Sequence, residues 1–290
     1  VKIPSAGALA KIYGDTKEAE SRFTSLAENF EERYHHKDAE FFTAPGRTEI
    51  IGNHVDHNGG QIIAASIDLD TIGAAYPNGT NVIHMVSEGY RQEVVVDLDR
   101  LSTENYTKGT DALVAGIMEY MNKKGYRTGG FDAYVSTKVI AAAGVSSSAS
   151  FEMLICAIMN YFSNEGKIDY VEYAKIGQYA EHEYWLKQSG LLDQMACAVG
   201  GVIAIDFKEE MPKVEKVEFG YDKLGYDLII VNTGKGHADL SEEYSAVPVE
   251  MKRAANVFGK EVLADVDEKE FMANLNKVRE EAGDRAVMRA

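Results

Sequence analysis

The chain contains few cysteines, few prolines and few basic residues. Its 290 residues include two cysteines, five prolines and one tryptophan. So few cysteines exclude a disulfide-dense secreted scaffold, and Cys156 and Cys197 both lie in apolar helical stretches, which predicts small buried thiols. No apolar run is long enough to span a bilayer. These absences favour a reduced, cytoplasmic protein.

Basic residues are also scarce. There are 30 Lys and Arg against 46 Asp and Glu, giving a net charge of −16. This balance argues against binding to nucleic acid or to an anionic membrane surface, although a local site can still be positive. The sequence has neither a Walker A motif nor a Gly-x-Gly-x-x-Gly fingerprint, so it is neither a P-loop protein nor a Rossmann protein.

What the chain does have is a dense polar segment at residues 44–60, which reads APGRTEIIGNHVDHNGG. Glycine lets the backbone approach a ligand closely, and Arg47 and Asp56 together supply hydrogen-bond donors and acceptors. This combination suits a small polyhydroxylated ligand. Taken alone, the segment is equally compatible with a polar loop containing turn glycines.

A second segment, GVSSSAS at residues 144–150, opens an apolar run that extends to Ile158. The first turn of a helix has unpaired N–H groups and partial positive charge, and serine hydroxyls can add donors or bind Mg²⁺. An ordinary serine N-cap is the simpler interpretation. Because three consecutive serines exceed what a cap needs, the segment favours a phosphate site.

A third segment combines AEHEYW at residues 180–185 with SGLLDQM at residues 189–195. Asp193 follows a glycine where a new helix is expected, and a lone aspartate there is usually a cap. Glu181 on the preceding helix is, taken singly, usually a solvent-facing residue.

In this order, the three segments resemble the galactokinases of the GHMP kinase family. That family carries a sugar motif of the type Gly-Arg…Ile-Gly-Glu-His-x-Asp, then Gly-Leu-Ser-Ser-Ser-Ala, then Ala-Glu-His and Gly-x-x-Asp-Gln. Residues 105–109 (NYTKG) are similar to the family's segment near the adenine pocket, and residues 237–244 (HADLSEEY) to the segment that brings a tyrosine to the sugar. The resemblance therefore covers nearly the whole chain.

The resemblance implies an ATP-dependent kinase that phosphorylates galactose or a close hexose at the anomeric hydroxyl, with Mg²⁺ as cofactor and a monomeric state. Asp193 would be the general base, and Arg47 would stabilise developing negative charge. Magnesium would be bound by Ser148 and Glu181. Nucleotide phosphates would be held by Gly144, Ser146, Ser147 and Ser148. Sugar contacts would come from Asn53, His54, Asp56, Gly190 and Tyr244.

The pattern of elements predicts an α+β protein of two domains. Strands are expected at 62–76, 82–86, 93–98, 131–137, 201–207, 213–219 and 226–232, and helices at 15–35, 110–125, 241–258 and 267–282. Thr110 is expected to cap its helix, with Leu113 and Ile117 facing inward, and Asp169 to cap the helix that carries Glu181. The pattern changes near Gly200. The N-terminal sugar- and phosphate-binding kinase domain, with a mixed sheet and helices, is therefore assigned to 1–200, and a GHMP-kinase-like α+β C-terminal domain to 201–290.

The chain departs from the family pattern at several positions. Asn53 stands where the family has glutamate, Glu49 where it usually has asparagine, and His57 where it has tyrosine. Residues 141–144 read AAAG where the family loop begins with proline and is richer in glycine. The family's third, C-terminal Gly-rich motif is missing, so we expect a fragment whose second domain is incomplete.

Two alternatives remain open at this stage. The altered loop also fits a catalytically weak sugar- and ATP-binding sensor of the same fold. A GHMP kinase for a non-sugar alcohol is the other possibility, and the sugar motif between Arg47 and Asp56 argues against it.

Overall fold

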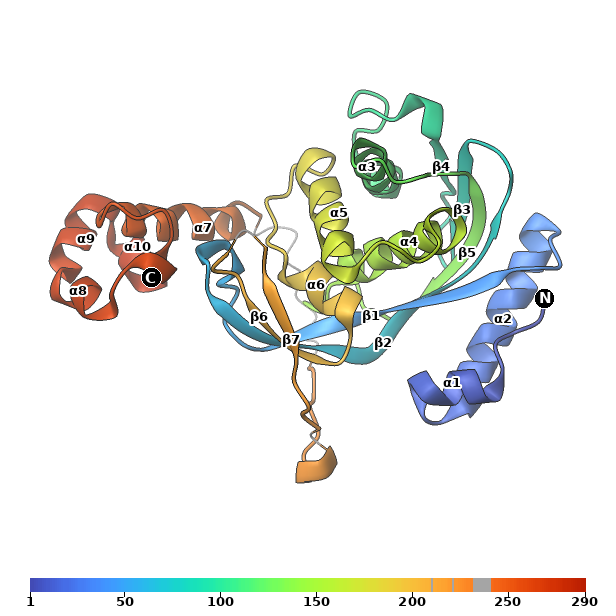
Figure 1. Cartoon of the computed structure of the whole chain (residues 1–290), viewed down its shortest axis with the longest axis horizontal. Coiled ribbons are helices and arrows are strands. Elements are labelled where there is room, and N and C mark those ends of the chain that lie inside the picture. Colours follow the sequence, from blue (N-terminus) through green and yellow to red (C-terminus); the bar gives the residue numbers. More distant parts are fainter. Residues whose placement is uncertain (210, 221, 232–240) are drawn as a thin grey trace. The chain divides into compact units, whose positions relative to one another are not determined.

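The fold is described from a computed structural model, for residues 1–209, 211–220, 222–231 and 241–290. The chain divides into two compact units (Figure 1). Unit 1 comprises residues 1–47, 66–141 and 145–199, and unit 2 comprises residues 48–65, 142–144 and 200–290. The functional assignment of 1–200 and 201–290 to two domains remains a proposal.

Unit 1 has a mixed sheet between two helical layers. Strand β5 (Phe131–Thr137) pairs antiparallel with the second half of β2 (Gln61–Pro77) and parallel with β3 (Val82–Ser87). Strand β4 (Val94–Asp97) forms the edge beside β3, and β1 (Glu40–Ile51) pairs with β2. The expected strands at 62–76, 82–86, 93–98 and 131–137 are therefore present.

The order of these strands differs from a simple hairpin. The turn after β2 leads into β3, but β5 lies between the two strands. Gly130 permits this, because a side-chain carbon there would lie 2.5 Å from the carbonyl oxygens of Thr80 and Val82. The sequence thus predicts where these strands begin and end, but it does not predict which strands are neighbours in the sheet.

The two faces of this sheet follow the alternation of β2 and β5. Ala75, Ala133 and Val135 face the main core, together with α3 (Gly109–Lys123), α4 (Ser147–Asn164) and α5 (Tyr170–Glu183). Ile72 and Ala74 face α1 (Ala6–Tyr13) and α2 (Thr16–Tyr34), which lie on the other side of the sheet (Figure 1). The long helix expected at 15–35 is α2, with the Asp15 side chain accepting from the Lys17 amide.

Close packing fixes the helix that carries Glu181. At Gly116 on α3, a side-chain carbon would lie 2.9 Å from the Cα of Ala180 on α5. The expected cap of α5 is present, because the Asp169 carboxylate accepts from the amide of Glu172 at 2.8 Å. Helix α3 differs slightly from expectation: it begins at Gly109 rather than after a Thr110 cap. Its predicted inward face, including Leu113 and Ile117, is buried.

Helix α6 (Leu192–Val199) completes unit 1 and contacts α4 and α5. Cys156 on α4 and Cys197 on α6 are free and buried, as expected, and burial raises the pKa of both thiols. No helix in the described ranges is long and apolar enough to cross a membrane.

Unit 2 begins with the polar segment and ends with helices. Residues 61–65 of β2 pair antiparallel with β6 (Val202–Asp206), which pairs with β7 (Lys213–Lys216). The short helix η1 (Asp56–Asn58) precedes β2, and η3 (Asp222–Leu224) follows β7. The C-terminal helices are α7 (Ser241–Asn256), η5 (Leu263–Asp265), α8 (Glu268–Ala273), α9 (Leu275–Ala282) and α10 (Asp284–Arg289).

Two expectations for unit 2 are wrong. The strand expected at 226–232 is not formed over 226–231, where no paired strand occurs; Asn232 lies outside the described residues. The helix expected at 267–282 is split at Asn274, whose side-chain amide donates to the Glu270 carbonyl and so competes with helical hydrogen bonding.

The apolar face of that helical segment also has a partner within the chain. Val278 and Ala282 are buried against Ala254 of α7 and Ala286 of α10, with Phe271 packed at the edge. The sequence predicts an incomplete second domain, but this face is covered from within the chain, by α7 and α10.

Candidate active site

An arginine–aspartate pair lies at the meeting point of β1, the start of α4 and the start of α6. Arg47 donates from Nε and Nη2 to Asp193 Oδ1, at 2.8 and 2.6 Å, and its side chain is 7% exposed. Ser146 Oγ donates to the other carboxylate oxygen at 2.7 Å. Both oxygens of Asp193 are therefore held, which fixes the direction of the carboxylate. The residue is thus more than a helix cap.

The serine run has the helical context that its sequence predicts. Ser147 and Ser148 form the first turn of α4, where backbone N–H groups lack helical partners. Ser146 precedes them in the left-handed region, with φ of 57° and ψ of 57°, and its hydroxyl points to Asp193 instead of capping α4. The N-terminal amides of α4 therefore have no side-chain cap from Ser146, as a phosphate site requires.

The loop before this helix takes backbone conformations that favour glycine. Gly144 has φ of 77°, which costs glycine little, but Ala142 has φ of 58°. A left-handed alanine is strained because its Cβ approaches the following carbonyl. Ala142 therefore carries backbone strain in a loop where the family pattern is richer in glycine.

Ser148 and Glu181 meet as the resemblance implies. Ser148 Oγ donates to Glu181 Oε1 at 3.1 Å, and Glu181 is 1% exposed. Lys187, which no sequence signal singled out, places its Nζ 2.6 Å from the same oxygen. Desolvation lowers the pKa of Lys187, but attraction to Glu181, the hydrogen bond to Glu181 and the nearby charges of Asp193 and Glu152 together outweigh it, so the net pKa lies above the ordinary value.

The Ser148 hydroxyl and the Glu181 carboxylate suit a metal ion that binds together with a nucleotide better than they suit a structural metal site. Among the described residues there is no group of three or more His, Cys, Asp or Glu side chains able to hold a metal ion. A hydroxyl and one carboxylate suit Mg²⁺, which commonly takes one or two carboxylates plus substrate phosphates. Ser148 and Glu181 could therefore hold Mg²⁺ when it arrives with a nucleotide.

A second buried carboxylate lies beneath this pair. Glu152 on α4 is 0% exposed, and its Oε2 accepts from Gln194 Nε2 at 3.0 Å, while Oε1 has no hydrogen-bond partner among the described residues. Burial raises the pKa of Glu152 well above its usual range, and repulsion from Glu181 adds to this. Glu152 is therefore protonated in the folded protein at pH values where it ionises in the unfolded chain.

This difference predicts a measurable dependence of stability on pH. Above the ordinary glutamate pKa of about 4.3 the unfolded chain releases a proton that folded Glu152 retains, so stability falls as pH rises, by up to about 1.4 kcal/mol per pH unit. Glu152→Gln should remove this loss. The measurement is urea unfolding between pH 5 and 9, with the exposed Glu183→Gln as control. An unchanged slope in Glu152→Gln would disprove the assignment.

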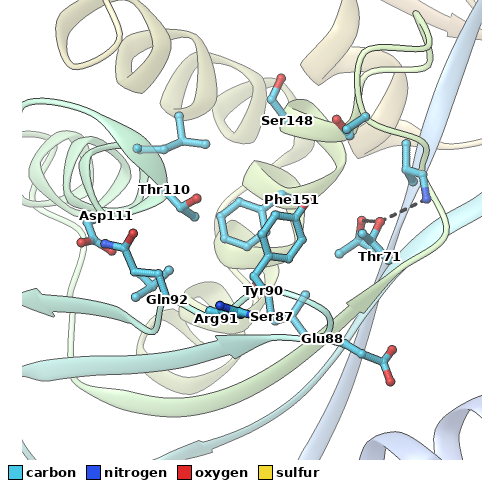
Figure 2. Close-up of a pocket in the computed structure, with 18 of the residues that line it drawn as sticks. Thr71, Ser87, Glu88, Tyr90, Arg91, Gln92, Thr110, Asp111, Ser148 and Phe151 are labelled. Carbon is cyan, nitrogen blue, oxygen red and sulfur yellow. Dashed lines mark hydrogen bonds between the residues drawn. The ribbon is translucent and has the colours of Figure 1, made fainter. Parts of the chain in front are cut away.

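A pocket of about 550 Å³ opens beside the start of α4 (Figure 2). Ser147, Ser148 and Phe151 of α4 line it, together with Lys108 and Gly109 from the segment expected near an adenine. The indole Nε1 of Trp185, another lining residue, donates to the Gly109 carbonyl at 2.8 Å. Sequence reasoning missed the wall formed by Ser87, Glu88 and residues 90–92, because nothing in that stretch resembles a motif.

The remaining sugar-motif residues belong to unit 2. The amide of His54 donates to Glu49 Oε1 at 2.9 Å, and the His54 ring lies 3.7 Å from Oε2. Asn53 has φ of 60°. Asparagine adopts this conformation more readily than glutamate does, which gives a backbone reason for the departure at this position. The Asp56 side chain is buried, 3.6 Å from the His57 ring.

Two candidate sugar contacts are less defined. Gly190 lies in the half-buried connection between α5 and α6. Tyr244 lies in α7, but its side chain lies outside what the structure describes, as do residues 237–240 of the same candidate segment.

Two family models match parts of this chain. The galactokinase galactose-binding signature matches residues 28–77, and the GHMP kinases N terminal domain matches residues 112–201. A galactokinase of Lactococcus lactis subsp. lactis is 30% identical over 89% of this chain and 66% of its own length. One of Clostridium tetani is 30% identical over 76% of this chain and 56% of its own length.

A solved structure extends the match to the fold. The crystal structure of Lactococcus lactis galactokinase complexed with galactose has a TM-score of 0.80 and 28% identity, covering 92% of this chain and 69% of that one. The fold and the serine-rich helix start are those of a GHMP kinase. The chain belongs to the galactokinase family of these sugar kinases, and it spans about two thirds or less of the length of the curated relatives named above.

Proposed function

We propose that the protein transfers the γ-phosphoryl group of ATP to the anomeric hydroxyl of galactose or a close hexose. One observation carries this proposal. The Asp193 carboxylate is fixed by Arg47 and by Ser146, and Ser146 directly precedes the helix turn that lines the 550 Å³ pocket. The groups proposed as base, cation and phosphate-binding helix start therefore lie together in one unit.

In this proposal the pocket takes the nucleotide. The free N–H groups at the start of α4 and the hydroxyls of Ser146, Ser147 and Ser148 hold the phosphates, with Gly144 leading into the turn. Ser148 and Glu181 hold Mg²⁺, which supplies neutralisation of phosphate charge when bound.

Asp193 would orient the acceptor hydroxyl and take its proton. The hydroxyl oxygen then bonds to the γ-phosphorus as the bond from that phosphorus to the β–γ bridging oxygen breaks, and ADP leaves. Arg47 stabilises the negative charge that develops during this exchange. Asn53, His54, Asp56, Gly190 and Tyr244 keep the sugar-contact roles that the resemblance gives them.

A catalytically weak sugar- and ATP-binding sensor is the second candidate. Two features favour it: the strained Ala142 in the phosphate loop, and the Lys187 ammonium on the carboxylate proposed to bind the metal. Either feature would lower turnover without removing the binding groups.

A coupled ADP-release assay separates the two candidates. We expect galactose or a near relative, within a panel of hexoses and hexosamines, to stimulate ADP release from ATP, and the product to carry phosphate at the anomeric oxygen. Calorimetry with the same sugars serves as the control for binding. Sugar binding without sugar-dependent ADP release would reject the enzyme and favour the sensor.

A further inference from the structure

Lys187 forms an ion pair with Glu181, the one carboxylate that the proposed function assigns to the metal. Its Nζ lies 2.6 Å from Glu181 Oε1, the oxygen that also accepts from Ser148. The Glu181 side chain is 1% exposed and that of Lys187 is 45% exposed. The ammonium ion therefore reaches the buried carboxylate from the solvent side.

The backbone after α5 is built to place this lysine. Leu186 has φ of 54°, a conformation that is strained for a residue with a bulky side chain, and it is 80% exposed, so burial does not compensate for the strain. The Lys187 amide donates to the Glu181 carbonyl at 3.0 Å, and the Ser189 amide donates to the Lys187 carbonyl at 2.9 Å. The strained turn therefore directs Lys187 back over the end of the helix.

The charges around Glu181 explain what the lysine contributes. Glu152 and Asp193 are the other acids nearby, and Arg47 is engaged with Asp193. A buried carboxylate that is left unpaired is strongly destabilising. Without a metal, the Lys187 ammonium supplies the compensating positive charge.

We propose that Lys187 competes with the divalent metal for Glu181: it stabilises the metal-free protein and weakens metal binding. The proposal rests on the proposed function, which assigns Glu181 and Ser148 to the metal. A long, half-exposed lysine side chain can move from the carboxylate into solvent once the metal ion supplies the compensating positive charge in its place. The metal must then displace a bound cation instead of entering an empty anionic site.

Removing the lysine should move metal affinity and metal-free stability in opposite directions. We expect Lys187→Met to bind Mn²⁺ about 5- to 20-fold more tightly, in the presence of a non-hydrolysable ATP analogue. The same variant should melt at a lower temperature than the wild type in EDTA, and saturating Mn²⁺ should close that gap. The measurements are the electron paramagnetic resonance signal of free Mn²⁺ and thermal unfolding.

Two further variants serve as controls. Lys187→Arg keeps the positive charge and should stay within about twofold of the wild type in Mn²⁺ affinity. Lys167→Met removes a lysine that pairs with Glu165 at 2.6 Å near the opposite end of α4, and it should leave Mn²⁺ affinity unchanged.

The outcomes separate this proposal from the proposed function. Unchanged or weaker Mn²⁺ binding in Lys187→Met would overturn the competition, even if the melting temperature falls, since a purely structural lysine gives that result. If Glu181→Gln binds Mn²⁺ with the analogue as tightly as the wild type does, the metal assignment itself fails. A failed ADP-release assay alongside tighter Mn²⁺ binding in Lys187→Met would leave the competition standing and reject only turnover.

Discussion

Replacing Asp193 with asparagine is expected to lower kcat by about 10²- to 10⁴-fold, the usual contribution of a general base. The amide keeps the shape of the carboxylate. Its oxygen can still accept hydrogen bonds from Arg47, and its NH₂ group can donate to the Ser146 hydroxyl. It loses the negative charge and the basicity that the acceptor hydroxyl needs. Sugar affinity, measured by calorimetry, should change far less than turnover.

The same substitution leaves Arg47 beside a neutral group, so a modest loss of stability, about 1–2 kcal/mol, should accompany it. Asp132→Asn is the matched control, because Asp132 is also a paired carboxylate of unit 1 but bonds to Asn78 and His36. Its kcat should equal that of the wild type. A near-normal kcat in Asp193→Asn would show that Asp193 has only a structural role in α6.

The second large effect concerns the proposed metal ligands. Ser148→Ala should lower kcat/KM for Mg²⁺-ATP by about 10- to 100-fold, and Glu181→Gln by about 100-fold or more, since each removes a donor to one ion. The double variant should be little worse than Glu181→Gln alone, because two ligands of one ion act as a unit. The measurement is the double-mutant cycle in kcat/KM.

The matched control for this cycle is Ser150→Ala, two residues along the same helix. Ser150 Oγ donates to the Ala44 carbonyl and is also hydrogen-bonded to the Thr71 hydroxyl, so its loss should lower stability but leave kcat/KM unchanged. If the effects of Ser148→Ala and Glu181→Gln simply multiply, the two residues do not share an ion.

The sequence predicted most elements of unit 1 because local signals specify them, but α1 and β1 were not predicted. Apolar alternation marks β2 and β5, and Asp15 and Asp169 mark the starts of their helices. The insertion of β5 between β2 and β3 was not predictable from such signals, since strand order depends on contacts between distant segments. The missing strand at 226–231 shows the same limit: β composition does not make a strand without a partner.

The polar residues of the site that belong to a recognisable sequence motif were predicted. Those outside any motif were missed. Arg47 and Asp193, 146 residues apart, are joined by two hydrogen bonds, as the resemblance implies. Lys187 and Glu152 carry no motif, and only the fold brings an exposed loop lysine and an apolar-helix glutamate to Glu181. A glutamate within the apolar run that begins at Phe151 was the available signal for Glu152.

The indole of Trp185 has a consequence for observing this protein. It is the chain's single tryptophan, it lines the pocket, and its Nε1 is bonded to the Gly109 carbonyl. Lys187, two residues later, is bonded to Glu181. Tryptophan emission from the protein therefore has one source. The natural fluorophore sits on the pocket wall, and a spectral change on adding a nucleotide reports on that wall without any attached label.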